Sequence, residues 1–304
     1  GTPAPASVAV DHAGGVDTAV LRVVQLNVGS LLEPGWAERR VEVVTWLDEL
    51  APDVVCLQEV WQDAANPNTA EWIAQHAAGE WHWVFGGLPV PEHLHADRSL
   101  LFGSAVLSRY PIDEHELHPL PVNRDEPEDP FSSIALELLR VRTAGLDVFS
   151  THLQPPPHQA YHRVRQVLHI DDVIRATVDP RAAMPPILCG DFNAEPTSDE
   201  IRFLTSNAVI DGRSTYFQDA WAVVRGNEVG WTQDPANPVY AAMNLPPKRI
   251  DYVFVGNPFR RPRGGGRIVG CELAFHEPRT GTHASDHYGL VVDITWPDRP
   301  GDPR

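Results

Sequence analysis

The sequence predicts an α/β protein, in which strands and helices alternate along the chain and pack in layers. A mostly apolar run over residues 19–28 predicts a strand, and apolar residues at helical spacing over 35–50 predict a helix. A second apolar strand follows over 53–59. Both strands place a polar side chain, Asn27 or Glu59, at or next to their last residue, as in α/β sheets, where functional groups gather at strand ends.

A single domain is the simplest organisation of the 304 residues. The chain shows no internal repeat and no shift in composition that would mark a linker. Residues 1–17 are rich in Ala, Pro and Gly without periodicity and predict a disordered lead. We therefore expect one domain over residues 18–297, followed by a tail over 298–304. The chain begins with Gly1, so we expect a processed or tagged chain, and its localisation, cytoplasmic or secreted, stays open.

Composition restricts the classes of partner. Hydrophobic residues make up 42% of the chain and no apolar run reaches the length of a membrane span. We therefore expect a soluble monomer without stable membrane insertion. The formal net charge of -17 repels nucleic acid unless a bound metal or a basic patch reverses it locally, so nucleic acid is a disfavoured partner. Cys56 and Cys189 lie inside apolar runs and predict no disulfide framework.

The middle of the chain predicts four further strands. Short apolar runs cover residues 81–85 and 104–108. Residues 132–141 and 146–151 predict a hairpin joined at Ala144 and Gly145, because small residues of this kind suit a tight turn. The second hairpin strand ends at a histidine, His152.

A polar loop and a long helix flank this hairpin. Residues 123–129 are acidic and proline-containing, which predicts a solvated loop. After three prolines at 155–157, apolar residues at spacings of three and four predict a helix. Its other face contains Arg163 and Arg165, which we expect to be solvated rather than to contact an anionic substrate.

The most informative stretch is an apolar strand over residues 187–189 that stops at Gly190 and then presents Asp191 and Asn193. Gly190 would permit a sharp exit from the strand, so that both polar side chains point the same way. An anionic Asp beside a neutral Asn suits hydrolysis at phosphorus, since one group accepts a proton from water and the other orients or neutralises the phosphate. An isolated Asp-x-Asn is more often an Asx turn, so the pair needs support from the rest of the chain. A capped helix start is predicted at Ser198.

Two more strands near the end of the chain carry ionisable side chains. Residues 248–255 predict a strand that contains Asp251 among apolar neighbours. Residues 285–294 predict the last strand, with Asp286 and His287 at its head.

Six predicted strand ends therefore carry side chains that suit metal binding or proton transfer. They are Asn27, Glu59, His152, Asp191 with Asn193, Asp251, and Asp286 with His287. Each has a structural alternative when taken alone: the histidines as satisfied core residues, Asp251 as an ion-pair partner of Arg249, and Glu59 as a helix cap. The combination favours catalysis over these separate explanations.

These side chains lie within six short sequence motifs, which follow one another along the chain. The motifs are Leu26-Asn27-Val28, Gln58-Glu59-Val60, Thr151-His152-Leu153, Gly190-Asp191-Phe192-Asn193, Arg249-Ile250-Asp251-Tyr252 and Ser285-Asp286-His287. In this set, from about Val23 to Ile294, the chain resembles the endonuclease/exonuclease/phosphatase superfamily. That superfamily includes deoxyribonucleases of the pancreatic type, AP endonucleases, neutral sphingomyelinases, inositol polyphosphate phosphatases and deadenylases. The resemblance implies a four-layer α/β sandwich, two mixed β-sheets packed face to face with helices on the outside and the site at one edge.

The resemblance also implies roles, position by position. Glu59 would be the main carboxylate ligand of Mg²⁺, with Mn²⁺ or Ca²⁺ as alternatives, and Asn27 and Asp286 would lie at the same metal. His287 would accept the proton of the attacking water or bond a phosphate oxygen, while Asp251 orients its ring.

The remaining roles concern the phosphate. Asp191 would position the nucleophile or contact the phosphate, and Asn193 would donate to the developing oxyanion. His152 would stabilise charge on the phosphate or protonate the leaving oxygen. Residues 98–110 contain no convincing glutamate partner for His152, although nucleases of the pancreatic type place one there.

The function implied by the resemblance is metal-dependent hydrolysis of a phosphodiester or phosphomonoester. We expect a small phosphorylated metabolite or a phospholipid head group as the substrate. A nuclease is the first alternative, and a non-catalytic binding module on the same fold is the second. The motif that contains Glu59 and Trp61 is similar to that of the sphingomyelinase branch, yet the sequence lacks the long aromatic hairpin of secreted sphingomyelinases. The loops expected to contact substrate, over 88–101, 121–132, 155–162 and 230–247, match no particular branch.

Overall fold

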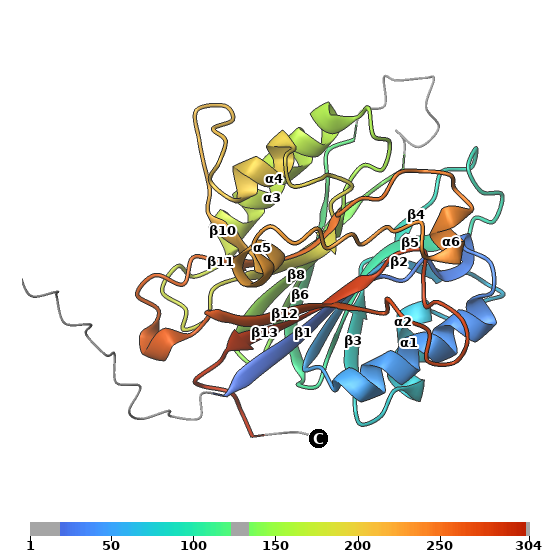
Figure 1. The fold of residues 1–304 in the computed structure, drawn as a ribbon, viewed down its shortest axis with the longest axis horizontal. Helices are drawn as coiled ribbons and strands as arrows, with labels where there is room; N and C mark the ends of the chain where they lie inside the picture. Colours follow the sequence, from blue (N-terminus) through green and yellow to red (C-terminus); the bar gives the residue numbers. More distant parts are fainter. Residues whose placement is uncertain (1–18, 123–133, 302–304) are drawn as a thin grey trace, which may run out of the picture.

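The computed structural model describes residues 19–122 and 134–301, arranged as two β-sheets that pack face to face between two layers of helices (Figure 1). The predicted lead over 1–17 and the predicted polar loop over 123–129 lie outside the described residues. The four-layer α/β sandwich is confirmed.

The first sheet contains β1 at its centre and mixes parallel and antiparallel pairs. β1 runs parallel to β2 and antiparallel to β13. In spatial order the strands are β12 (Ile268–Ala274), β13 (Gly289–Thr295), β1 (Val20–Asn27), β2 (Val54–Gln62), β5 (Leu101–Ser108) and β3 (His82–Phe85), and the short β4 (Leu88–Pro89) also pairs with β5.

The second sheet is built around the parallel pair β8 and β9. The predicted hairpin forms its β7 and β8, with positive φ at Ala144 (49°) and Gly145 (77°) in the turn. In spatial order the strands are β10 (Phe217–Asp219), β11 (Asp251–Gly256), β9 (Ile187–Asp191), β8 (Leu146–His152), β7 (Glu137–Thr143) and β6 (Ile112–Pro119).

Helices cover the outer face of each sheet. α1 (Trp36–Leu50) and α2 (Thr69–His76) pack on the first sheet, and α3 (Ala160–Thr177) and α4 (Asp199–Leu204) pack on the second (Figure 1). The shorter helical segments are η1 (Ser30–Leu32), α5 (Ala220–Arg225), α6 (Pro238–Ala241) and η3 (Pro262–Gly264). Within the described residues, no helix has both the length and the apolar composition needed to cross a bilayer.

Three apolar clusters hold these four layers together. The central one fills the space between the two sheets and includes Val23, Cys56, Val148 and Cys189. The other two lie between each sheet and its own helices. Strands buried on both faces explain why the sequence shows continuous apolar runs rather than clean alternation.

Sheet topology brings the predicted strand ends to one edge. The carboxyl ends of the parallel strands β1 and β2 lie together in one sheet, and those of β8 and β9 lie together in the other. β11 and β13 run antiparallel to these strands, so their amino ends reach the same edge. Asp251 begins β11, and Asp286 and His287 precede β13 by two or three residues.

Two local predictions about strands differ from the structure. β2 does not end at Glu59 but continues to Gln62, because a bulge lets the strand pass the site. Gly190 makes no exit turn and lies inside β9, where a Cβ would come within 2.3 Å of the Thr151 carbonyl oxygen. The need for glycine is therefore a close approach of β8, and the change of direction falls at Asn193, whose φ is 48°.

The long helix also has a less solvated polar face than predicted. Arg165 is exposed, but Arg163 is buried, pairs with Glu200 at 2.8 Å and donates to three backbone carbonyls of the segment before the helix. Its role is to fasten that segment and α4 to α3. Ser198 precedes α4 as predicted, but its hydroxyl donates to the Glu195 carbonyl instead of capping the helix.

Candidate active site

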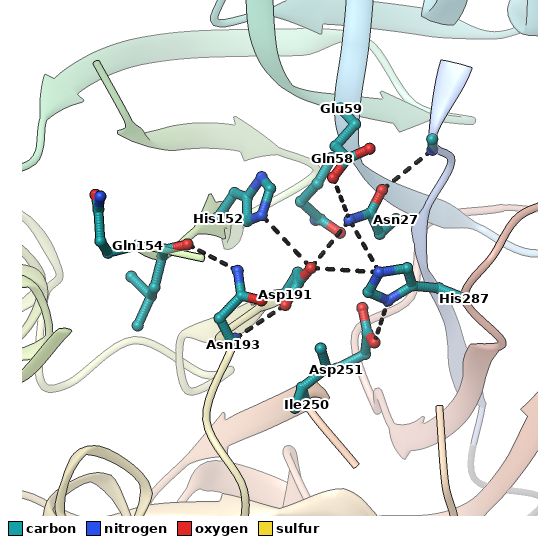
Figure 2. A network of polar contacts seen from close by, with 12 residues as sticks. Asn27, Gln58, Glu59, His152, Gln154, Asp191, Asn193, Ile250, Asp251 and His287 are labelled. Atoms are coloured by element: carbon teal, nitrogen blue, oxygen red, sulfur yellow. Dashed lines mark hydrogen bonds and ion pairs between the residues drawn. The ribbon is translucent and has the colours of Figure 1, made fainter. Parts of the chain in front are cut away.

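Asn27 lies at the centre of the converging strand ends (Figure 2). Its Nδ2 is 3.0 Å from Oε1 of Glu59, 2.9 Å from Oδ2 of Asp191 and 3.5 Å from Nε2 of His287. Its Oδ1 accepts the backbone N–H of Gly29 at 3.1 Å, which fixes the orientation of the amide. Asn27 thus presents donors to the two carboxylates, rather than the oxygen that a metal ion would require.

His287 is held between carboxylates. Its Nδ1 lies 2.7 Å from Oδ2 of Asp251, and its Nε2 lies 3.7 Å from Asp191 and 3.6 Å from Asp286. Burial alone would lower the pKa of His287, but the negative charges of Asp251, Asp286 and Asp191 raise it well above its usual value. The Nδ1 contact leaves Nε2 facing the centre of the site.

Glu59 reaches the site because of the bulge in β2. The pairing of β2 with β5 shifts register between Leu57 and Val60, and Glu59 adopts a positive φ of 56°. A non-glycine residue in this region carries strain of about 1–3 kcal/mol, which persists where the surrounding structure imposes it. The predicted alternative of a helix cap is wrong, since Glu59 lies within a strand.

His152 and Asp191 face each other from the ends of the parallel strands β8 and β9. Nε2 of His152 lies 3.5 Å from Oδ2 of Asp191. Asp191 accepts the backbone N–H of Asn193 through Oδ1 at 2.9 Å, so the Asx turn and the site coexist. Asn193 donates from Nδ2 to the Leu153 carbonyl at 2.9 Å, which engages one of its two amide hydrogens.

Crowded carboxylates give the site an unusual electrostatic state. Burial, followed by the charge of Asp286, raises the pKa of Glu59 to about 8. Burial likewise raises the pKa of Asp251 to about 6 and, together with Asp286, that of Glu33 to about 7. Burial lowers the pKa of His152. Repulsion of this kind is relieved by a cation among the acids.

The donor set fits a divalent metal ion. Ligating atoms of Glu59, His152 and Asp191 lie within 4.8 Å of one another, as do those of Asp191, Asp251 and His287. Carboxylate oxygens are the ligands that Mg²⁺ prefers. Asp286 belongs to neither group of three but is near enough to Glu59 to raise its pKa.

The structure brings all eight predicted side chains to one place and adds three that the sequence analysis missed. Gln233, from the irregular segment before β11, places Nε2 at 3.1 Å from Nε2 of His287. Glu33 follows η1 and lies close to Asp286. Only spatial proximity identifies these residues, because neither lies at a predicted strand end.

Arg39 is the third addition and a buried cation beneath the site. It donates to backbone carbonyls on both sides of the candidate site, including those of Val28 at 3.1 Å and Ala284 at 2.9 Å. Its remaining acceptors are the carbonyls of Ser30, Glu33 and Pro34. Arg39 therefore ties the loop after Asn27 to the loop before Asp286.

The alternative pairing of Asp251 with Arg249 is wrong. Arg249 instead forms a two-pronged ion pair, at 3.1 and 2.8 Å, with Asp219 at the end of the neighbouring strand β10. Asp251 is left to His287. His152 receives a carboxylate neighbour from Asp191, whereas residues 98–110 supply none, as the sequence analysis found.

The fold and this arrangement of acids and histidines define a metal-dependent hydrolase of phosphoester bonds. Residues 24–287 match the family model described as Endonuclease/Exonuclease/phosphatase family. The match covers most of the chain, so the protein belongs to that family. No curated protein matches the sequence.

Solved structures share the fold at low identity. TDP2 from D. rerio, complexed with single strand DNA product, is 19% identical with a TM-score of 0.67, over 91% of this chain and 100% of that chain. An endonuclease/exonuclease/phosphatase from Beutenbergia cavernae DSM 12333 is 23% identical with a TM-score of 0.65, over 91% and 71%. The human Nocturnin catalytic domain with bound sulfate anion is 20% identical with a TM-score of 0.62, over 90% and 93%.

Proposed function

We propose that the protein is a Mg²⁺-dependent phosphoester hydrolase in which water attacks phosphorus in line with the leaving oxygen. The substrate that we propose is a small phosphodiester or phosphomonoester, such as a phosphorylated metabolite or a phospholipid head group, and the protein acts as a monomer. The observation that supports this most directly is the chain of contacts Asp251–His287–Asp191–Asn27–Glu59, which joins an oriented histidine to a cluster of carboxylates.

Glu59 is the main metal ligand in this proposal, and Asp286 supports it. When bound, the divalent ion neutralises charge on the phosphate and orients it for attack. Asn27 holds the carboxylates of Glu59 and Asp191 close together by donating its amide hydrogens to both. Asn27 would lie next to a bound ion, but its oxygen accepts the N–H of Gly29, so we propose that it orients the carboxylates and is not the main ligand.

His287 acts as the general base. Its Nδ1 proton is directed to Asp251. The charges of Asp251, Asp286 and Asp191 raise the pKa of His287, so Nε2 would lose its proton and become available to the attacking water once a bound divalent ion offsets the charge of these acids. Gln233 and Asn27 are near the same nitrogen and limit rotation of the ring. Asp191 positions the water or the phosphate from the opposite strand end.

His152 and Asn193 act on the phosphate oxygens. Burial lowers the pKa of His152 and so favours the neutral imidazole. A neutral imidazole can donate a hydrogen bond from its one N–H. We propose that it stabilises charge on the phosphate in preference to protonating the leaving oxygen. The second amide hydrogen of Asn193 remains for the developing oxyanion.

Turnover of small phosphoesters by the metal-loaded protein tests this proposal. We expect release of phosphate or alcohol only with Mg²⁺, and its loss in His287→Ala, because that change removes the base. The matched control is His115→Ala, which alters an exposed histidine on β6. Turnover that is equal in all three proteins would come from a contaminant and would contradict the proposal.

Nuclease activity is the second candidate, favoured by the likeness to TDP2 complexed with single strand DNA product. The net charge of -17 opposes it. Incubation of single-stranded DNA and RNA with wild type and His287→Ala decides between the two. Degradation by the wild type alone, weakening steeply with salt, would make nucleic acid the substrate.

A further inference from the structure

An apolar cavity of about 350 Å³ opens directly beside Glu59 and His152. Both side chains belong to its wall, so one end of the cavity is the catalytic site itself. The rest of its lining comes from η1, β2, β5, the segments that follow β4 and β8, and the residues before β7. This lining is mostly apolar and includes Trp61, Val90, Leu94, Leu100 and Phe102.

Aromatic rings form the floor of the cavity. Trp61 packs edge-on against Phe102 and against His95, with ring centroids 6.5 and 5.4 Å apart. The indole N–H of Trp61 donates to Asp63 at 2.7 Å, so the one polar atom of the ring has its partner within the chain. Trp61, Leu100 and Phe102 form a small cluster of their own, apart from the three large ones. The rings therefore offer an apolar surface next to the catalytic carboxylates.

The cavity lining would not stabilise a second anionic group of the substrate. Among the described residues that line it there is no lysine or arginine, and its ionisable members are Glu59, His95 and His152. A second phosphate or a carboxylate placed there would lose its water without gaining a cation, which is costly. An apolar group would lose only unfavourable contact with water.

We propose that this cavity binds the organic substituent of the substrate, and that this substituent is an alkyl chain or a single aromatic ring. The inference rests on the proposed phosphoesterase function, since the phosphate must lie at Glu59 and His152. The volume corresponds to roughly twelve water molecules at ~30 Å³ each, enough for a chain of about six to eight atoms or for one ring. A nucleoside with its polar sugar fits this lining less well.

Binding of phosphonates tests the cavity independently of turnover. The C–P bond is not hydrolysed, so calorimetry with Mg²⁺ compares methylphosphonate with butyl- and octylphosphonate below the concentration at which they form micelles. We expect affinity to rise roughly fourfold per methylene until the cavity is full, equivalent to about 0.8 kcal/mol each. Octylphosphonate should therefore bind at least about a hundredfold more tightly than methylphosphonate, with a negative heat-capacity change.

Two variants that fill the cavity supply the structural test. Leu94→Trp and Val90→Trp add bulk from partly buried positions in the cavity wall, and neither residue is among the proposed catalytic or metal-binding side chains. Each should reduce the preference for octylphosphonate at least tenfold while leaving methylphosphonate affinity unchanged. Val209→Trp is the matched control, because Val209 is 72% exposed and lies outside the cavity.

The outcomes separate this inference from the proposed function. Equal affinity for the three phosphonates, or a preference that survives both filling variants, overturns the cavity assignment even if His287-dependent turnover is present. A preference that both filling variants abolish supports the assignment. Absence of turnover with every ester would then count against the proposed function alone.

Discussion

The Nδ1 atom of His287 lies 2.7 Å from Oδ2 of Asp251, although 36 positions separate the two residues in the sequence. This contact joins a residue preceding β13 of one sheet to the first residue of β11 in the other. It orients the ring of the histidine and links the two sheets at the edge where the candidate site lies.

Replacing Asp251 with asparagine tests the role of this contact in turnover. The new amide side chain can still reach His287 but cannot balance a positive charge on the ring, so kcat should fall by about 10²–10⁴-fold with a smaller change in KM. Steady-state kinetics on a small phosphoester measures the effect. Asp172→Asn, at an exposed position of α3, should leave kcat unchanged; a kcat for D251N within a factor of two of the wild type would remove Asp251 from the mechanism.

Glu59→Gln should have opposite effects on metal binding and on metal-free stability. In the wild type, Mg²⁺ at about 100 times its Kd adds roughly 2.7 kcal/mol of stability, and most of this gain should disappear in the variant. Without metal, burial raises the pKa of Glu59 to about 8, so an ionised carboxylate above that pH disfavours the fold. The neutral amide avoids this cost.

Thermal unfolding at pH 8.5, with Mg²⁺ and with a chelator, measures both effects of Glu59→Gln. The variant should unfold at or above the wild-type temperature in chelator and below it in Mg²⁺. Glu80→Gln, at an exposed position, is the control. A full shift by Mg²⁺ in E59Q would show that the ion binds elsewhere.

Arg39→Met should destabilise the protein and impair catalysis together. The substitution leaves five backbone carbonyls without their charged donor, at a cost of about 3 kcal/mol or more. Because two of these carbonyls belong to Val28 and Ala284, the loops next to Asn27 and Asp286 lose their common anchor.

Urea unfolding and kcat of the folded variant separate the two consequences of Arg39→Met. Arg202→Met, which removes an exposed pair with Asp199, should change stability by less than about 1 kcal/mol. If R39M were destabilised but had wild-type kcat, Arg39 would serve the fold without positioning the site.

Glu137 should make stability depend on pH. Burial raises its pKa to about 8 from 4.5, while its carboxylate accepts the backbone N–H of Ser104. Below about 4.5 the group is protonated in both folded and unfolded states. Between about 4.5 and 8 the unfolded chain ionises first, so Glu137 lowers the free energy of unfolding by up to ~1.4 kcal/mol per pH unit. Above that range the loss is complete.

Urea unfolding of wild type and Glu137→Gln between pH 5 and about 8.5 isolates this contribution. The difference in stability should move in favour of E137Q as pH rises, because the amide keeps an acceptor for Ser104 without ionising. Glu114→Gln, exposed on the neighbouring β6, should show a constant difference. A constant difference for E137Q as well would place its folded-state pKa near the ordinary value.

The sequence alone was sufficient for the order of the strands that carry the site and for eight of the side chains that meet there. Apolar runs bounded by polar residues predicted β1, β2, β8, β9 and β11, because buried strands leave a strong local pattern. The sequence did not predict α2, β6 or β12. β6 is mostly exposed and its residues lack an apolar run, so the edge strand forms only through its pairing with β7.

The orientation of each side chain was decided by tertiary structure. Asn27 and Asp191 lie 164 positions apart, and their contact turns the amide nitrogen of Asn27 toward the acids. Glu59 reaches them only because β2 bulges against β5, and Gly190 is needed because β8 passes close to β9. Gln233, Glu33 and Arg39 joined the site without any local sign in the sequence. The apolar cavity is likewise formed by segments that are far apart in the sequence. Because the hydrophobic effect is non-directional, an apolar pattern predicts that a side chain is buried but not which neighbours surround it.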